Sequence, residues 1–419
     1  MEILSKGEKI KRARVYKGLT LKDVCSDRIS VSKLSCIEND KVEPESDVLE
    51  YISEKLDLDL DYLRLGISEH LEENYDLLKD YKDKKDYKDS LEYNLKVAKN
   101  YGDYGIAVKF MHLMFTYYLR NNDIREIPFI IGDYYDICQK VYTEENRIVY
   151  YCDMSRYCFR NKEFNQAINF CSNIRKFFLN KENLNNHYLI IATYNEIACY
   201  LSLKDYDRAL HILTDLEKVV DYEENVERKA KMYEVMAIIC LRKNREKFKS
   251  YEEKSYELYG EDWEGKANAI YNYAFTMFQI GTKDQGVEYL ERALKLYPKH
   301  NRINLVDFML SVTEVLVSCD VLELSKTICN KALDCAIEVD KIEYIEKAYY
   351  YKAKIYFKFK LYSEAEIYMN LCLDALVKFG NSEELHERYL EMGSMYYEMN
   401  NLKDSLKYFN LAIKLEKKL

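Results

Sequence analysis

The segment AFTMFQIGTKDQGVEYLERALKLYP, residues 274–298, contains the pattern from which the fold can be predicted. Small residues stand at Ala274, Gly286 and Ala293, and Pro298 closes the segment. Small residues allow the backbones of two helices to approach closely, and a proline cannot continue a helix. The segment therefore predicts two antiparallel helices that cross at the small positions and end at the proline.

Similar segments recur after residue 70, and aligning them gives nine starts, at about residues 71, 107, 148, 190, 230, 267, 306, 346 and 386. The pattern resembles the tetratricopeptide repeat, whose usual period is 34 residues. The resemblance implies nine helical hairpins in a right-handed superhelix, with the first helix of each hairpin on the concave side. Pro128 is expected to interrupt the hairpin that starts at 107.

The composition agrees with an all-α protein. The 419 residues include only 12 glycines and 3 prolines, which argues against sandwiches, barrels and glycine-rich phosphate loops. The net charge of −9 argues against a chain that coats nucleic acid or an anionic membrane along its whole length. Many of the 41 tyrosines, such as Tyr200, Tyr356 and Tyr396, are expected between packed helices.

The remaining chemistry indicates an intracellular binding protein. No stretch approaches the ~20 apolar residues of a membrane-spanning helix, and the N-terminus lacks the apolar run of a signal peptide. The twelve cysteines form no Cys-x-x-Cys pair, so we expect most of them to be reduced, buried hydrophobes. No metal-ligand spacing or nucleophile–base pair stands out. We expect a cytoplasmic protein without cofactor that is not an enzyme.

The first 66 residues read as a separate helical unit. Residues 1–22 hold seven Lys and Arg against two Glu. One helix is expected up to Gly18, a second over Leu21–Cys25 with Thr20 as N-cap, and a third from N-cap Ser30 to Glu38. Ser46 is expected to open a fourth helix, before Leu60 and Leu63 close the bundle. Two short helices joined by a tight turn form a helix-turn-helix, whose second helix can enter the major groove of DNA. The alternative is a small bundle used only for docking.

Two motifs make this interpretation specific. The chain opens with Gly7-x-x-Ile10-Lys11-x-x-Arg14-x-x-x-Gly18-Leu19-Thr20 and continues with Leu34-Ser35-x-Ile37-Glu38-Asn39-x-Lys41-x-x-Pro44. Together they resemble the lambda-repressor/Cro-like (XRE) DNA-binding domain. The resemblance implies DNA contacts at Arg14, Thr20, Lys22, Ser30, Ser32, Lys33 and Cys36. Cys36 stands where a basic residue is common and Asp40 replaces the usual glycine, and both lower the positive potential.

The repeat register also predicts a groove with amide and aromatic side chains. Asn268, Asn272 and Gln279 can pair with both backbone groups of an extended peptide. Arg156 and Arg160 can grip a carboxylate. The alternative is that these polar residues only keep a solvated groove wet. The complete set of expected peptide-binding residues is Arg156, Arg160, Asn195, Glu234, Arg242, Asn268, Tyr271, Asn272, Phe275, Gln279, Tyr351 and Lys354.

The whole chain resembles the RRNPP family of peptide-responsive quorum-sensing regulators of Gram-positive bacteria. That resemblance implies DNA binding by residues 1–66, and peptide binding and dimerisation by residues 67–419. It implies a homodimeric transcription factor on double-stranded promoter DNA, switched by an imported short linear signalling peptide. Asn195, Asn268 and Asn272 would hold the peptide backbone. The competing interpretation is a tetratricopeptide-repeat scaffold, or an inhibitor of a partner protein, in which DNA binding is secondary.

Overall fold

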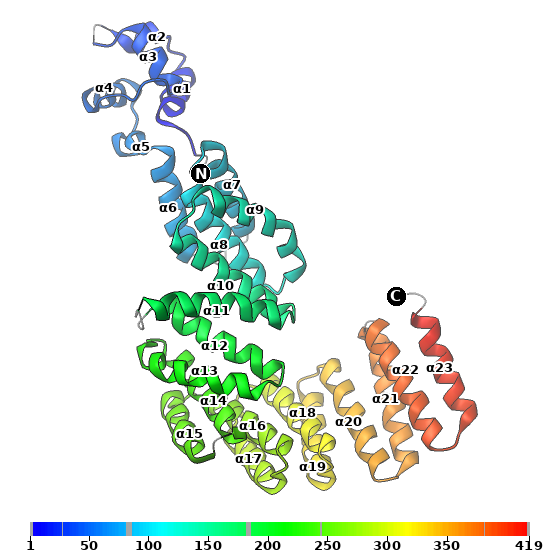
Figure 1. The fold of residues 1–419 in the computed structure, drawn as a ribbon. Helices are drawn as coiled ribbons and strands as arrows, with labels where there is room; N and C mark the ends of the chain where they lie inside the picture. The colour runs from blue at the N-terminus through cyan, green and yellow to red at the C-terminus, as the bar shows by residue number, and fades with distance from the viewer. Residues whose placement is uncertain are drawn as a thin grey trace. The chain divides into compact units, whose positions relative to one another are not determined.

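The computed structural model describes residues 3–26, 28–80, 86–181, 186–243, 245–380 and 382–416. Within these ranges every regular element is a helix and there is no strand, which confirms the all-α prediction (Figure 1). The chain divides into two compact units, Met1–Tyr222 and Glu223–Leu419. The boundary predicted at residue 66 lies inside the first unit and stays a prediction.

Unit 1 begins with five short helices: α1 (Lys6–Tyr16), α2 (Leu21–Cys25), α3 (Val31–Glu38), α4 (Ser46–Leu56) and α5 (Leu60–Arg64). The Thr20 hydroxyl accepts the amide of Asp23, and the Ser30 hydroxyl accepts the amide of Lys33. These side-chain caps satisfy amides that have no partner within their own helices. The predicted bounds of the second and third helices are therefore confirmed. A shared core of buried residues between Ile10 and Leu63 holds the five helices together.

The turn after α3 packs against the start of α1 because Gly7 has no side chain. A Cβ atom at Gly7 would lie 2.2 Å from the carbonyl oxygen of Ile37. Asp40 occupies this turn with a φ of +52°, a left-handed conformation that aspartate tolerates better than most residues. Its carboxylate accepts hydrogen bonds from the Gly7 amide (3.1 Å) and the Ser5 hydroxyl (2.5 Å). Asp40 at the expected glycine position thus ties the end of α3 to α1.

Four hairpins complete unit 1: α6 (Ile67–Asp80) with α7 (Tyr87–Tyr101), α8 (Tyr104–Arg120) with α9 (Ile127–Lys140), α10 (Glu144–Arg160) with α11 (Phe164–Asn180), and α12 (His187–Ser202) with α13 (Tyr206–Val219). Pro128 does not interrupt the second hairpin. It lies in the first turn of α9, directly after the short 3-10 helix η1 (Ile124–Glu126). A proline is tolerated there because that turn needs no amide donor.

Unit 2 contains five hairpins: α14 (Val226–Lys243) with α15 (Arg245–Tyr259), α16 (Trp263–Gln279) with α17 (Lys283–Leu296), α18 (Arg302–Ser318) with α19 (Leu322–Glu338), α20 (Ile342–Lys358) with α21 (Tyr362–Phe379), and α22 (Ser382–Glu398) with α23 (Leu402–Glu416). Each of the nine predicted starts falls three or four residues inside the first helix of a hairpin. The repeat register is therefore confirmed over both units.

The small residues occupy the helix crossings, as the repeat pattern predicts. A Cβ atom at Gly286 would lie 3.0 Å from the ring of Phe278, and one at Gly393 would lie 2.9 Å from the ring of Phe409. Tyrosines fill the neighbouring space, and the ring of Tyr396 stacks on that of Tyr408 at 5.5 Å. These contacts explain why two of the few glycines stand where helices cross, since a larger residue would collide with the neighbouring ring.

The cysteines and the helix surfaces add three observations. Eight of the twelve cysteines are buried, and all twelve are free thiols. None of the helices that the structure describes is both long and apolar enough to cross a membrane. The same portion of the chain contains no group of three His, Cys, Asp or Glu side chains placed to hold a metal ion.

Candidate functional site

The helices α2 and α3 present most of the residues predicted to contact DNA. Lys22, Ser30 and Ser32 are exposed, whereas Lys33 and Cys36 are half-buried. The Lys33 ammonium lies 3.3 Å from a carboxylate oxygen of Glu45 on the residue before α4. The first turn of α3 therefore offers hydroxyl groups and backbone amides at its exposed N-terminus, with one lysine that is already paired.

Arg14 has a different place from the other predicted DNA contacts. Its Nε and Nη2 atoms donate to the two carboxylate oxygens of Glu38 at 2.6 and 2.8 Å, and its Nη1 atom donates to the carbonyl of Leu19 at 2.9 Å. The side chains of Arg14 and Glu38 are only 14% and 4% exposed. This hydrogen bonding raises the pKa of Arg14 further above its ordinary value. The placement favours a structural role that joins α1 to α3 over the DNA contact predicted from the sequence.

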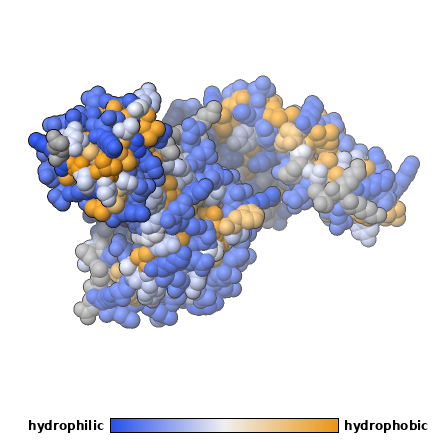
Figure 2. Space-filling model, turned by 90° about the horizontal axis from the view of Figure 1, so that it is seen from above, coloured by the Kyte–Doolittle hydropathy of each residue, from blue (hydrophilic) through white to orange (hydrophobic). Residues whose placement is uncertain are grey.

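The charge of the N-terminal bundle is polarised along the sequence. Residues 1–66 hold 12 Lys and Arg against 14 Asp and Glu, and most of the acidic residues come after α3. Exposed cations on and between α1 and α2 include Lys11, Lys17 and Lys22. In Figure 2 this bundle is the lobe at the left and nearest the viewer, and it shows a group of hydrophobic residues surrounded by hydrophilic ones. The bundle thus carries exposed lysines on and between α1 and α2 and a partly apolar surface.

In unit 1, the three predicted groove residues lie on the first helices α10 and α12. Arg160 is exposed and Asn195 is half-buried. Nη1 of Arg156 lies 3.7 Å from Oδ1 of the fully buried Asp153. The other oxygen of Asp153 is 2.7 Å from Nδ1 of His112 and accepts from the Tyr134 hydroxyl at 2.8 Å. Arg156 therefore faces a buried acid, which reduces its pull on a ligand carboxylate.

In unit 2, side chains of successive first helices touch one another across a single repeat. We call the surface formed by α14, α16, α18, α20 and α22 the first-helix face. Nδ2 of Asn272 donates to Glu234 at 2.7 Å, and Arg242 donates to Gln279. The Tyr271 hydroxyl reaches the carbonyl of Ser311 at 3.5 Å. Asn268 and Phe275 on the same helix are exposed. Several predicted groove residues are thus paired with each other, and Asn268 and Phe275 stay open to solvent.

Glu234 is a buried acid that receives two hydrogen bonds. Besides Asn272, the hydroxyl of Tyr259 donates to it at 2.9 Å. Burial raises the pKa of the Glu234 carboxyl above its usual value, and the two hydrogen bonds offset part of that rise. Glu234 therefore orients the Asn272 amide and is not itself open to a ligand.

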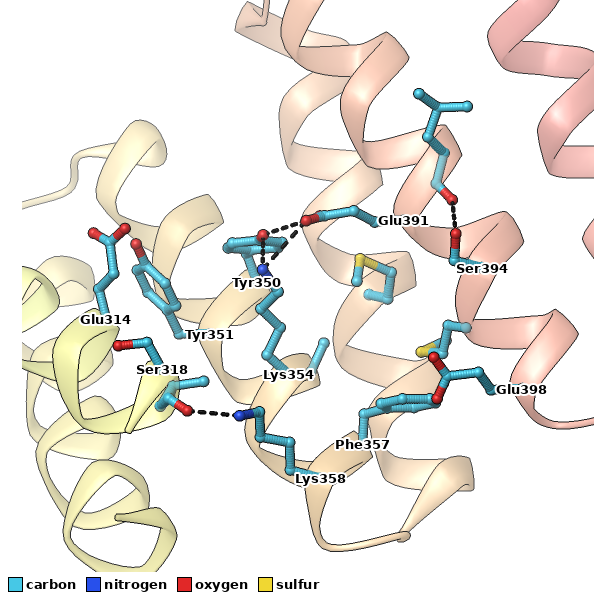
Figure 3. Close-up of a pocket in the computed structure, with 15 residues that line it drawn as sticks. Glu314, Ser318, Tyr350, Tyr351, Lys354, Phe357, Lys358, Glu391, Ser394 and Glu398 are labelled. Carbon is cyan, nitrogen blue, oxygen red and sulfur yellow. Dashed lines mark hydrogen bonds and ion pairs between the residues drawn. The ribbon is translucent and has the colours of Figure 1, made fainter. Parts of the chain in front are cut away.

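A cavity of about 500 Å³ lies on the first-helix face between α18, α20 and α22 (Figure 3). It contains Tyr351 and Lys354, two of the predicted peptide-binding residues. Its apolar side chains are Val317, Ala353, Phe357, Met369, Leu390 and Met395. Ligand sites commonly join such an apolar wall to a few polar groups that fix orientation.

The polar rim of the cavity is held by internal hydrogen bonds and ion pairs. The Tyr350 hydroxyl donates to Glu391 at 2.6 Å, and the Lys354 ammonium lies 3.2 Å from the same carboxylate. Lys358 donates to the carbonyl of Val317 at 2.8 Å and pairs with Asp320 at 2.5 Å (Figure 3 shows the former contact). Both lysines of the cavity therefore have partners within the protein.

The part of the cavity that α22 provides was not predicted from the sequence. Glu391, Ser394, Met395 and Glu398 line it, and none of them was among the expected site residues. Glu391 lies 41 positions after Tyr350, the residue it accepts a hydrogen bond from. Carrying the register of the preceding hairpin one repeat further would have found these side chains.

Comparison with known proteins supports the repeat assignment. The tetratricopeptide repeat family matches residues 267–300 and 386–419, which begin at two of the predicted starts. A comparison of the sequence with curated proteins finds no match.

Among solved structures, the apo form of the quorum sensor NprR from B. thuringiensis has 17% identity and a TM-score of 0.49, over 84% of this chain and 100% of that one. The apo form of RapI has 16% identity and a TM-score of 0.49, over 84% and 97% of the two chains. NprR in complex with its cognate peptide NprX has 16% identity and a TM-score of 0.44, over 84% and 99%. TM-scores below 0.5 establish no shared fold, so these likenesses carry no argument about this chain.

Proposed function

We propose that the protein is a cytoplasmic transcriptional regulator that binds promoter DNA through its N-terminal helices and is switched by a short signalling peptide on its repeats. It acts as a homodimer, in which the spacing of two α3 helices sets the DNA half-sites that it can bind. The observation that carries the proposal is the pairing of a capped α2–α3 arrangement with an apolar cavity on the first-helix face.

The DNA-binding half of the proposal rests on the first turn of α3. Ser30 and Ser32 are exposed there, and the free N-terminal amides of a helix attract phosphate. Lys22 on α2 and Lys11 on α1 are exposed cations that can hold the DNA backbone. Thr20, Lys33 and Cys36 complete the proposed contact surface, and Arg14 supports it from inside. The acidic residues after α3 predict a modest affinity with a small number of phosphate contacts.

The peptide-binding half rests on the first-helix face. The cavity supplies apolar area for side chains, while Asn268, Asn272 and Phe275 lie on α16. The remaining residues proposed on this face are Glu234, Arg242, Tyr271, Gln279, Tyr351 and Lys354, and in unit 1 Arg156, Arg160 and Asn195 are proposed contacts on α10 and α12. Of these, Glu234 and Arg242 act by orienting Asn272 and Gln279. A peptide can switch the protein only if it binds the two states of the protein with different affinity.

Selection of DNA from a random double-stranded pool tests this function directly. The full chain is incubated with the pool, and bound DNA is sequenced after several rounds. We expect an enriched sequence with two related half-sites, and we expect Ser32→Ala with Lys33→Ala to abolish the enrichment. Ser68→Ala with Lys96→Ala, on the repeat helices, is the matched control. A pool that stays random for the wild type would contradict the proposal.

One observation favours a second function, the docking of a partner protein by the N-terminal bundle. The bundle holds more acidic than basic residues, and its exposed residues include Val31 and Val42, at 40% and 43% exposure. A protein-binding bundle would give no DNA enrichment in the same experiment. Its binding to the partner protein would be lost on Val31→Asp. The two functions are therefore distinguished by one selection and one variant.

A further inference from the structure

We infer that the cavity between α18, α20 and α22 takes a peptide segment in which a bulky apolar side chain stands next to a basic group, and that Glu314 binds the basic group. The inference rests on the proposed peptide binding and deepens it by naming the chemical class of the ligand. The cavity has an apolar wall, two carboxylates without a cationic partner among the described residues, and a tyrosine ring beside one of them.

The apolar wall of the cavity determines that the ligand carries a bulky apolar side chain. Phe357, Met369 and Met395 line the cavity from three different helices, and each offers a large or flexible apolar surface. A volume of about 500 Å³ holds more than one apolar side chain. Methionines adapt to ligands of different shape, so the wall accepts leucine, phenylalanine or a similar side chain. Burial of such a side chain would supply most of the binding free energy.

The charges of the cavity determine that the ligand carries a basic group. Lys354 is held by Tyr350 and Glu391, and Lys358 by the carbonyl of Val317 and by Asp320. Across the residues that the structure describes, neither Glu314 nor Glu398 has a Lys, Arg or His nitrogen within ion-pair distance. The two lysines are therefore paired with acidic groups, while Glu314 and Glu398 have no cationic partner among the described residues, and the cavity attracts a cation and repels an acidic segment.

The Tyr351 ring places that cation at Glu314. The side chains of Glu314 and Tyr351 point toward each other in Figure 3, and burial, together with the nearby Glu314 carboxylate, raises the pKa of Tyr351 above its ordinary value. Burial and, to a smaller extent, the negative charge of Glu314 on α18 raise the pKa of Tyr271 on α16 to about 12. A carboxylate beside the Tyr351 ring suits an ammonium or guanidinium group, which gains both an ion pair and a cation–π contact.

Selection from a phage-displayed library of random heptapeptides tests the inference on the full chain. Three proteins are used in parallel: the wild type, Glu314→Gln, and Glu323→Gln on the exposed first turn of α19 as matched control. We expect wild type and control to enrich peptides with Lys or Arg beside a bulky apolar residue. We expect Glu314→Gln to keep the apolar residue and lose the basic one. A synthetic peptide from the wild-type selection should bind Glu314→Gln roughly tenfold more weakly, as for a charge-assisted hydrogen bond.

The outcomes separate the inference from the proposed function. Enriched peptides without a basic residue, or a basic preference that survives Glu314→Gln, would overturn the inference and leave peptide binding intact. Failure of every protein to enrich any peptide would overturn both. Circular dichroism of Glu314→Gln shows whether the exposed substitution has left the helical fold unchanged.

Discussion

Nδ2 of Asn272 donates a hydrogen bond of 2.7 Å to the buried carboxylate of Glu234, one repeat earlier in the chain. This contact fixes which end of the Asn272 amide is used inside the protein. The amide oxygen is left as an acceptor on the first-helix face, where it can take a backbone N–H of a bound peptide. The hydrogen bond connects a buried acid to a proposed ligand contact, and it is stronger when the acid is ionised.

Glu234→Gln should change how stability depends on pH. Burial raises the pKa of Glu234, so between the unfolded value of about 4.3 and the higher folded value the folded state holds the proton more tightly. The wild type therefore loses stability relative to Glu234→Gln as the pH rises through this window. Thermal unfolding of both proteins should show the wild type relatively more stable at about pH 4.5 than at about pH 7. Glu253→Gln, an exposed site on α15, is the control and should show no such trend.

The sequence predicted those parts of the fold that depend on local chemistry and on repetition. Thr20 and Ser30 carry their own capping signals, so the bounds of α2 and α3 follow from a few neighbouring residues. The hairpin starts follow from small residues that recur at corresponding positions of several repeats, and Gly393 against Phe409 shows why they must be small there.

The site was harder to predict because its properties arise from pairs that are far apart in sequence. Arg14 was expected at DNA, and only the packing of α1 on α3 shows that Glu38 occupies it. The pairing of Asn272 with Glu234, and of Lys354 with Glu391, spans a full repeat. A register shows which side chains share a face, but it does not show which of them neutralise one another.

Arg14→Ala should destabilise the N-terminal bundle. The substitution would leave the carboxylate of Glu38 buried without its partner, at a cost of about 3 kcal/mol. Hydrogen exchange of the amides of α1 and α3 in the full chain should therefore become faster. Arg14→Ala with Glu38→Ala should recover part of the loss, because no buried charge then remains. Protection equal to that of exposed Lys11→Ala would show that the ion pair has no structural role.

Lys22→Ala should weaken DNA binding without changing which sequence is bound. If Lys22 contacts one phosphate, the slope of log affinity against log salt should fall by about 1. Fluorescence anisotropy with the DNA selected from the random pool, at four salt concentrations, measures this slope. Lys96→Ala on α7 is the matched exposed lysine and should leave the slope unchanged. An equal effect of both variants would show only a general dependence on net charge.

Gly393→Val should destabilise the last hairpin, because a Cβ atom at this position already meets the ring of Phe409 at 2.9 Å. We expect a loss of roughly 1–3 kcal/mol, typical of overpacking. Phe409→Ala in the same protein should lose less than the sum of the two single substitutions. Gly132→Ala, in α9 with no atom within 4 Å of the added Cβ, should instead stabilise by roughly 0.5–1 kcal/mol. Thermal unfolding of the four variants decides between these expectations.

The most direct test of the account is to measure DNA affinity with and without bound peptide. The DNA is the sequence selected from the random pool, and the peptide is the tightest binder from the heptapeptide library. Saturating peptide should change the dissociation constant for DNA by at least about fivefold, and saturating DNA should change the peptide dissociation constant by the same factor. If each ligand binds with the same affinity whether or not the other is present, the two sites are independent and the protein is not a peptide-switched regulator.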